Sequence, residues 1–130
     1  MEKTETIKIV IPIQPITKKN SQMIVMNPKT GRPFIVPSKQ YKQYEKDAGK
    51  FLKPLPYHMD YPVNIKCLFY MKTKRRVDLT NLLESADDVL VKYGIIPDDY
   101  FTIIGGHDGS RVLHDKDFPR TEIYITRLEE

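Results

Sequence analysis

The chain has little of what several familiar protein classes require. It contains one cysteine, Cys67, in 130 residues, so no internal disulfide can form, and a lone cysteine argues against a zinc site. No apolar run approaches the roughly 20 residues needed to cross a bilayer. The first 20 residues lack the continuous apolar region of a secretory signal. We therefore expect a cytoplasmic protein with no membrane partner and with Cys67 as an inert thiol in the core.

Several catalytic motifs are also missing. The chain has no phosphate-binding glycine loop, so nucleotide hydrolysis is unsupported. Ser110 has no nucleophile elbow around it. The pairs that begin at His107 and His114 lack the helical spacing of a zinc protease and have no third ligand nearby. We interpret both histidines as surface residues.

Length and composition are those of one compact domain spanning residues 1–130. A chain of 130 residues with 40% hydrophobic content can bury one core but is too short for two. The net charge of +4 is only moderately basic. Such a total is compatible with a polyanionic partner without requiring one, so the distribution of charge must decide.

Alternating apolar residues predict strands in five places. The first is Thr6–Ile13, and Pro12 and Pro15 either end it or confine it to a sheet edge. Two short apolar runs, 23–26 and 33–36, flank a turn-rich segment and predict a β-hairpin with a basic tip. The other predicted strands, the last two joined by the polar segment Gly105–Arg120, are Tyr61–Lys72, Tyr100–Ile104 and Thr121–Leu128.

Two segments show the period of a helix. Ser38 can cap a helix that runs to about Leu52 and turns lysines outward. Its predicted packing residues are Tyr41, Tyr44, Ala48, Phe51 and Leu52. The second helix, Asn81–Tyr93, has one apolar stripe and ends at Gly94. The element order predicts an α+β domain with a mixed sheet and two main helices.

Carboxylates gather around the second helix. They are Asp78, Glu84, Asp88, Asp98 and Asp99. Carboxylate oxygens bind Mg²⁺, and Mg²⁺ held this way can activate water and stabilise a leaving oxygen in phosphodiester cleavage. If the strands on either side of the helix are neighbours in the sheet, we expect Asp78 and Asp99 to lie close together. The pattern indicates a metal-dependent nuclease.

Cationic residues precede this acidic region directly. Lys72, Lys74, Arg75 and Arg76 fall within five positions. A second basic segment includes Lys18 and Lys19 and continues without an acidic residue as far as Arg32. Phosphate oxygens are the obvious partners of two such segments, although a solvated loop explains many single runs.

Ordinary structural roles explain part of the acidic pattern equally well. Asp78, Thr80 or Asn81 can cap the helix, and Asn81 with Glu84 resembles a capping box. Asp87 fits a solvated helix face better than a metal contact. The pair Asp98 and Asp99 is also typical of a turn after glycine and proline.

At these residues the chain resembles the RusA family of Holliday junction resolvases. The similarity covers mainly residues 63–126, and the matching positions are Asp78, Asn81, Leu82, Asp88, Asp98 and Asp99. The chain departs from the family pattern at Thr80, where the family has its second motif aspartate, and at Glu84, where the family has a lysine. A carboxylate at position 84 can shift a metal ligand by one turn and preserve the negative charge of the site.

The resemblance implies a homodimeric endonuclease, often phage- or prophage-encoded, that uses Mg²⁺ or Mn²⁺ to cut four-way DNA junctions in recombination and repair. We expect the catalytic residues to be Asp78, Asn81 and Asp99, which match the family pattern, together with Glu84, which departs from it. Two other interpretations stay open. One is a DNA-binding module that has lost its nuclease activity, and the other is a small adaptor that contacts a protein through its acidic helix.

Overall fold

The structure, a computed structural model, describes residues 6–17, 22–55, 60–98 and 103–128. Within these ranges the chain forms two helices and seven strands. Their bounds, in chain order, are β1 Thr6–Ile11, β2 Gln22–Met26, β3 Pro33–Pro37, α1 Lys39–Gly49, β4 Val63–Met71, α2 Leu79–Lys92, β5 Ile104–Gly106, β6 Arg111–His114 and β7 Arg120–Arg127. The expected α+β domain with a mixed sheet is confirmed. Neither described helix has the length and apolar character that a bilayer crossing demands.

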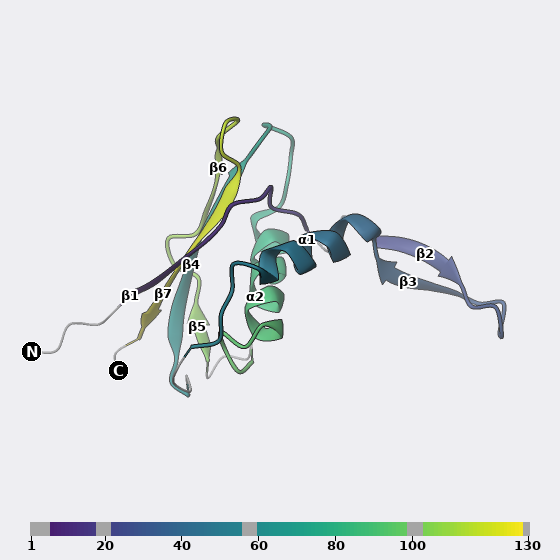
Figure 1. Cartoon of the computed structure of the whole chain (residues 1–130), viewed down its shortest axis with the longest axis horizontal. Coiled ribbons are helices and arrows are strands. Elements are labelled where there is room, and N and C mark those ends of the chain that lie inside the picture. Colours follow the sequence, from purple (N-terminus) through teal and green to yellow (C-terminus); the bar gives the residue numbers. More distant parts are fainter. Residues whose placement is uncertain (1–5, 18–21, 56–59, 99–102, 129–130) are drawn as a thin grey trace, which may run out of the picture.

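The main sheet is built around β4. On one side β7 pairs with β4 antiparallel, and β1 pairs antiparallel with β7 to form an edge, as the prolines allow. On the other side both β5 and β6 run parallel to β4, with β5 at its start and β6 at its end. Residues of β4 alternate between buried and half-buried, as expected for a strand with one covered face. Both helices lie on the same side of this sheet (Figure 1).

The first helix begins at the predicted cap. The Ser38 Oγ accepts a hydrogen bond from the Tyr41 backbone N–H at 3.1 Å. One face is buried and consists of Tyr41, Tyr44 and Ala48. Exposed lysines line the other face, namely Lys39, Lys42 and Lys46. Because α1 ends at Gly49, Phe51 leaves the helical stripe and is 45% exposed, so the prediction that Phe51 packs is wrong.

The second helix also carries the predicted apolar stripe. Its buried members include Leu82, Ala86, Val89 and Leu90. Gly94 adopts a left-handed conformation with φ +76°, which glycine tolerates without steric cost. This conformation lets the N–H of Ile95 bond to the carbonyl of Leu90 at 2.9 Å. The predicted helix stop at Gly94 is therefore confirmed.

The two helices meet where Gly49 faces Tyr93. A Cβ atom at position 49 would lie 2.3 Å from the Tyr93 ring, so a larger residue there would collide. The Tyr93 hydroxyl donates to the Glu45 carbonyl at 3.0 Å, and the Glu45 carboxylate pairs with Lys92. These contacts fix α1 across α2.

The predicted hairpin forms, and it stands apart from the sheet. Strands β2 and β3 pair antiparallel, with Ile24 opposite Ile35. The hairpin projects from the N-terminal end of α1, away from the sheet (Figure 1). At its tip Gly31 has φ +70°, and its N–H bonds to the Asn27 carbonyl at 2.8 Å.

The C-terminal third differs from the sequence prediction in two ways. The predicted strand Tyr100–Ile104 overlaps β5 only at Ile104, and residues 99–102 lie outside the described ranges. The predicted polar connector Gly105–Arg120 contains a strand, β6. This strand has only four residues, most of them exposed, so it lacks the alternation that would reveal it.

Candidate functional site

The candidate site is centred on Asp78, the residue that precedes α2. Asp78 is the N-cap, but its side chain makes no capping hydrogen bond and is exposed. Instead, the Asn81 Nδ2 donates to the Asp78 Oδ2 at 3.4 Å. Because the helix begins at Leu79, Asn81 and Glu84 do not form a capping box. The carboxylate of Asp78 thus faces solvent at the positive end of the helix dipole.

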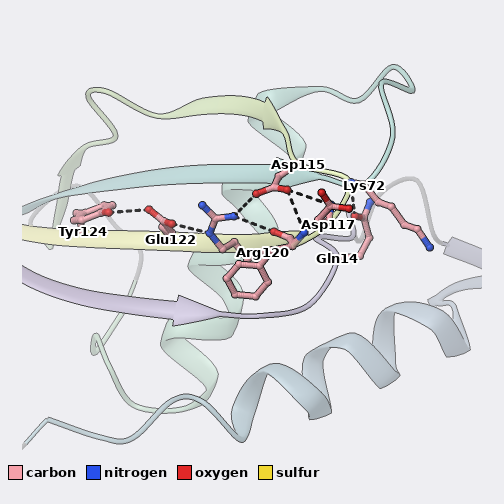
Figure 2. A network of polar contacts seen from close by, with 8 residues as sticks. Gln14, Lys72, Asp115, Asp117, Arg120, Glu122 and Tyr124 are labelled. Atoms are coloured by element: carbon pink, nitrogen blue, oxygen red, sulfur yellow. Dashed lines mark hydrogen bonds and ion pairs between the residues drawn. The ribbon is translucent and has the colours of Figure 1, made fainter.

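The cationic loop, Lys72–Arg76, joins the end of β4 to this N-cap. Its four basic side chains are all exposed. The loop is held at its start, where the Lys72 N–H donates to the Gln14 Oε1 at 2.8 Å. The Nε2 of His114 donates to the Lys72 carbonyl at 3.2 Å. In Figure 2 the Lys72 side chain points away from the neighbouring polar network. The backbone is anchored while the charges remain in solvent.

That network lies at the start of β7 and was not predicted from the sequence. Arg120 donates from Nε to the Glu122 Oε2 at 2.7 Å and from Nη1 to the Asp115 Oδ2 at 2.9 Å (Figure 2). The Tyr124 hydroxyl donates to the other Glu122 oxygen at 2.8 Å. The guanidinium also lies 3.7 Å from the centre of the Tyr70 ring. Alternation of Arg120, Glu122 and Tyr124 on one face of β7 was the available signal.

Within this network the carboxylates of Asp115 and Glu122 are both paired with the guanidinium of Arg120. The hydrogen bond from Arg120 is the main reason that the pKa of Asp115 is lowered. Burial raises the pKa of Glu122, but the hydrogen bonds from Arg120 and Tyr124 outweigh it and the net pKa is lowered. These carboxylates therefore stay ionised beside Arg120, and their role is to hold the start of β7 and the turn before it.

Two further candidate ligands lie along α2. Glu84 is exposed on the outer surface of the helix. Asp88, one turn later, is half-buried, and its charge contributes to the raised pKa of Tyr41, after burial and Glu45. Asp88 therefore lies on the side of α2 that faces α1. Neither residue belongs to a group of three or more potential ligands among the residues that the structure describes.

Sheet topology corrects the reason for expecting Asp78 near Asp99. The flanking strands are neighbours, but they run parallel, and Val63 at the start of β4 pairs with Ile104 at the start of β5. Asp78 follows the other end of β4. Asp98 follows the opposite end of α2, a helix of 14 residues, or about 21 Å. Neighbouring strands thus do not by themselves bring the two acidic segments together.

Three predicted site residues lie outside the described ranges: Asp99, Lys18 and Lys19. Their roles stay predictions.

Asp87 corrects another expectation. It is only 9% exposed, not part of a solvated face. His107, which follows β5, donates from Nε2 to both carboxylate oxygens of Asp87, at 3.0 and 2.9 Å. His107 is thus half-buried rather than a surface histidine. The signal was the position of Asp87, one turn from the apolar residues Leu83 and Val91.

The Asp87–His107 pair ties α2 to the sheet. Its hydrogen bond raises the pKa of His107, although burial opposes the change. Asp87 also contributes to the raised pKa of Cys67, which is mainly an effect of burial. The thiol is therefore protonated and inert, as predicted.

A scan against models of known protein families finds none that matches this chain, and a search of curated proteins finds no significant relative.

Proposed function

We propose that this protein is a RusA-like endonuclease that cuts four-way DNA junctions with Mg²⁺, or with Mn²⁺ in its place. One observation carries the proposal. The exposed Asp78 carboxylate lies at the N-terminus of α2, directly after a loop that presents four exposed cations. A carboxylate next to basic side chains is the arrangement that places a metal ion beside a phosphate.

The donor chemistry at Asp78 suits Mg²⁺. Asp78 and Asn81 offer hard oxygen donors, and their side chains already touch. Glu84 is the proposed third ligand, with Asp88 and Asp99 as further candidates. Asp98 follows the opposite end of the 14-residue α2, about 21 Å along the helix from Asp78, so it does not share this ion. A bound Mg²⁺ would lower the pKa of a coordinated water and neutralise charge on the leaving oxygen.

The cationic loop would hold the substrate backbone. Lys72, Lys74, Arg75 and Arg76 would contact phosphates together with Lys18 and Lys19, and such contacts position DNA without selecting a sequence. Selection would come from the shape of branched DNA. A homodimer suits this substrate, because a two-fold axis presents one site to each of two equivalent strands.

A second candidate is a junction-binding module without nuclease activity. It is favoured by the lack of any cluster of three potential metal ligands in the described ranges. Both candidates predict salt-sensitive binding, so only cleavage separates them.

The deciding experiment is cleavage of a labelled four-way junction, beside a linear duplex of the same arms, with Mg²⁺, Mn²⁺ or chelator. We expect paired symmetric nicks in the junction for the wild type. Asp78→Asn should lose them, whereas Asp60→Asn, which removes an exposed carboxylate near the start of β4, should retain them. Glu84→Gln should raise the Mg²⁺ concentration needed for half-maximal cutting.

Junction binding without cutting under every metal condition would contradict the nuclease and support the binding module. Absence of junction binding would contradict both.

A further inference from the structure

The β2–β3 hairpin contains four of the large apolar side chains that are exposed in the described part of the chain, including the three with the highest exposed fractions. Their exposed fractions are 73% for Ile24, 64% for Ile35, 58% for Met26 and 44% for Phe34. Soluble proteins rarely leave several neighbouring apolar residues in water unless they bind something.

These residues occupy both faces of the hairpin. Ile24 lies opposite Ile35, whereas Val25 lies opposite Phe34, and successive side chains of a strand point to opposite faces. Two-stranded ribbons are marginally stable in water unless something packs on them. The helices cover the main sheet, and the hairpin projects away from them (Figure 1).

All charge near these apolar residues in the sequence is positive. The two strands contain no charged residue, and the tip presents Lys29 and Arg32, both exposed and without an ion pair in the described part of the chain. In the sequence, no Asp or Glu occurs from Thr6 to Tyr44. The same stretch contains seven basic residues, namely Lys8, Lys18, Lys19, Lys29, Arg32, Lys39 and Lys42.

The positive charge and the apolar surface together indicate which kind of molecule binds the hairpin. A second copy of the arm, packed in parallel, would bring like charges together at the tip, which is unfavourable; an antiparallel pair would leave the tip cations without a partner. A nucleic acid duplex has the complementary charge, and a two-stranded ribbon fits its major groove. Proteins that kink DNA insert apolar side chains such as Ile, Met and Phe between base steps.

We infer that the hairpin is a DNA-binding arm. Its tip cations contact phosphates, and its exposed Ile24 and Ile35 side chains insert at the branch point of the junction. Each strand has five residues, which at 3.4 Å per residue gives an arm of about 17 Å, longer than the roughly 12 Å width of the major groove. This inference rests on the proposed function and deepens it, because it names the element that senses the branch.

The test uses a four-way junction with 2-aminopurine at the branch point and, separately, in the middle of one arm. Wild-type protein should raise the fluorescence only at the branch. The double variant Ile24→Ser with Ile35→Ser should abolish that rise and weaken junction binding by roughly tenfold or more. The control is Phe51→Ser, because Phe51 is also apolar and 45% exposed but lies outside the arm; it should behave as wild type.

A second pair of variants tests the tip. Lys29→Gln with Arg32→Gln should lower the salt dependence of log K by about 2, one unit for each lost phosphate contact. Lys53→Gln with Lys116→Gln removes the same charge from exposed positions elsewhere and should change the slope less.

The outcomes separate the two proposals. If the wild type binds and cuts junctions while the double Ile variant keeps both its affinity and its fluorescence rise, the proposal of a DNA-binding arm is wrong and the proposal of a nuclease is retained. If the wild type binds no junction, both are wrong. If the Ile variant halves the mass measured by light scattering, the hairpin joins two copies of the chain, and the DNA-binding arm is overturned. Thermal melting at the wild-type temperature would show that the variants are folded.

Discussion

The strand β4 and the β2–β3 hairpin are built from similar residues but lie in opposite environments. In β4 the side chains of Ile65 and Cys67 are fully buried, and Phe69 is 1% exposed. In the hairpin Ile24 and Ile35 are more than half exposed. The difference arises from what packs on each face, since α1 and α2 cover the sheet and leave the hairpin open. Apolar strand composition therefore contributes stability in one region and, we propose, binding in the other.

The largest contrast is expected from the same substitution in both regions. Ile65→Ala should lower the free energy of unfolding by about 2–5 kcal/mol, because it empties a fully buried site. Ile35→Ala should change it by about 0.5 kcal/mol or less, because that side chain is already in water. Urea unfolding of both variants checks the prediction. Equal losses would show that the hairpin is part of the cooperative unit.

Arginine substitutions offer the next comparison. Arg120→Ala should cost about 1–3 kcal/mol, because it leaves the largely buried Glu122 carboxylate without its main partner. Arg32→Ala, at the hairpin tip, should leave the free energy of unfolding within about 0.5 kcal/mol of wild type. Both are measured by urea unfolding at pH 7. If Arg120→Ala left the free energy of unfolding unchanged, water would be replacing the hydrogen bonds that Arg120 makes.

Two glycines with positive φ sharpen the contrast further. Gly94 (φ +76°) ends α2 and Gly31 (φ +70°) lies in the hairpin tip. Gly94→Ala should cost about 1–2 kcal/mol of global stability through the strained backbone. Gly31→Ala carries the same strain, but it should only loosen the tip, since a local element can open without unfolding the domain. Hydrogen exchange distinguishes the two, and increased exchange across the sheet in Gly31→Ala would contradict the prediction.

The smallest expected effect is a pH dependence of the melting temperature. It arises from the Asp87–His107 pair between α2 and the main sheet and not from the hairpin. Asp87 raises the pKa of His107 in the folded state above the ordinary value of 6.5. The pair therefore contributes its full stability below pH 6.5, and this contribution is lost as the pH rises through the folded pKa. Melting temperature measured from pH 5.5 to 8.5, the range roughly spanning histidine titration, should fall in this window.

Two histidine variants test that assignment. His107→Gln should flatten the pH profile, whereas His114→Gln, which changes an exposed histidine, should retain it. A wild-type melting temperature that does not change with pH would show that the Asp87–His107 pair does not contribute to the stability of the fold.

Local patterns predicted most of the fold. Period and capping residues located both helices, and Ser38 and Gly94 mark their ends as expected. Alternation located the main strands and the hairpin. Two of the failures depend on contacts with distant segments. The edge strand β6 has too few apolar residues to show a period and is defined by its pairing with β4, and the buried Asp87 accepts hydrogen bonds from His107, which belongs to a distant segment.

The candidate site was predictable to a similar degree. The position of Asp78 at the start of a helix, with Asn81 beside it, follows from sequence and is present in the structure. Which carboxylates converge does not follow, because that depends on the direction of β5 relative to β4. Because β5 runs parallel to β4, the chain must return along α2 to the start of β4, so Asp78 and Asp98 lie at opposite ends of that helix. No local sequence pattern predicts the direction of β5.

The place of β7 in the sheet sets an order of events in folding. This last strand lies between β1 and β4 and joins Thr6 to Thr126 across 120 residues of chain. During synthesis β1 has no neighbour until β7 emerges, whereas the hairpin and both helices depend on nearby residues. We therefore expect closure of the sheet to be the slow step. A chain truncated before Arg120 would leave β1 and β4 without the strand that joins them.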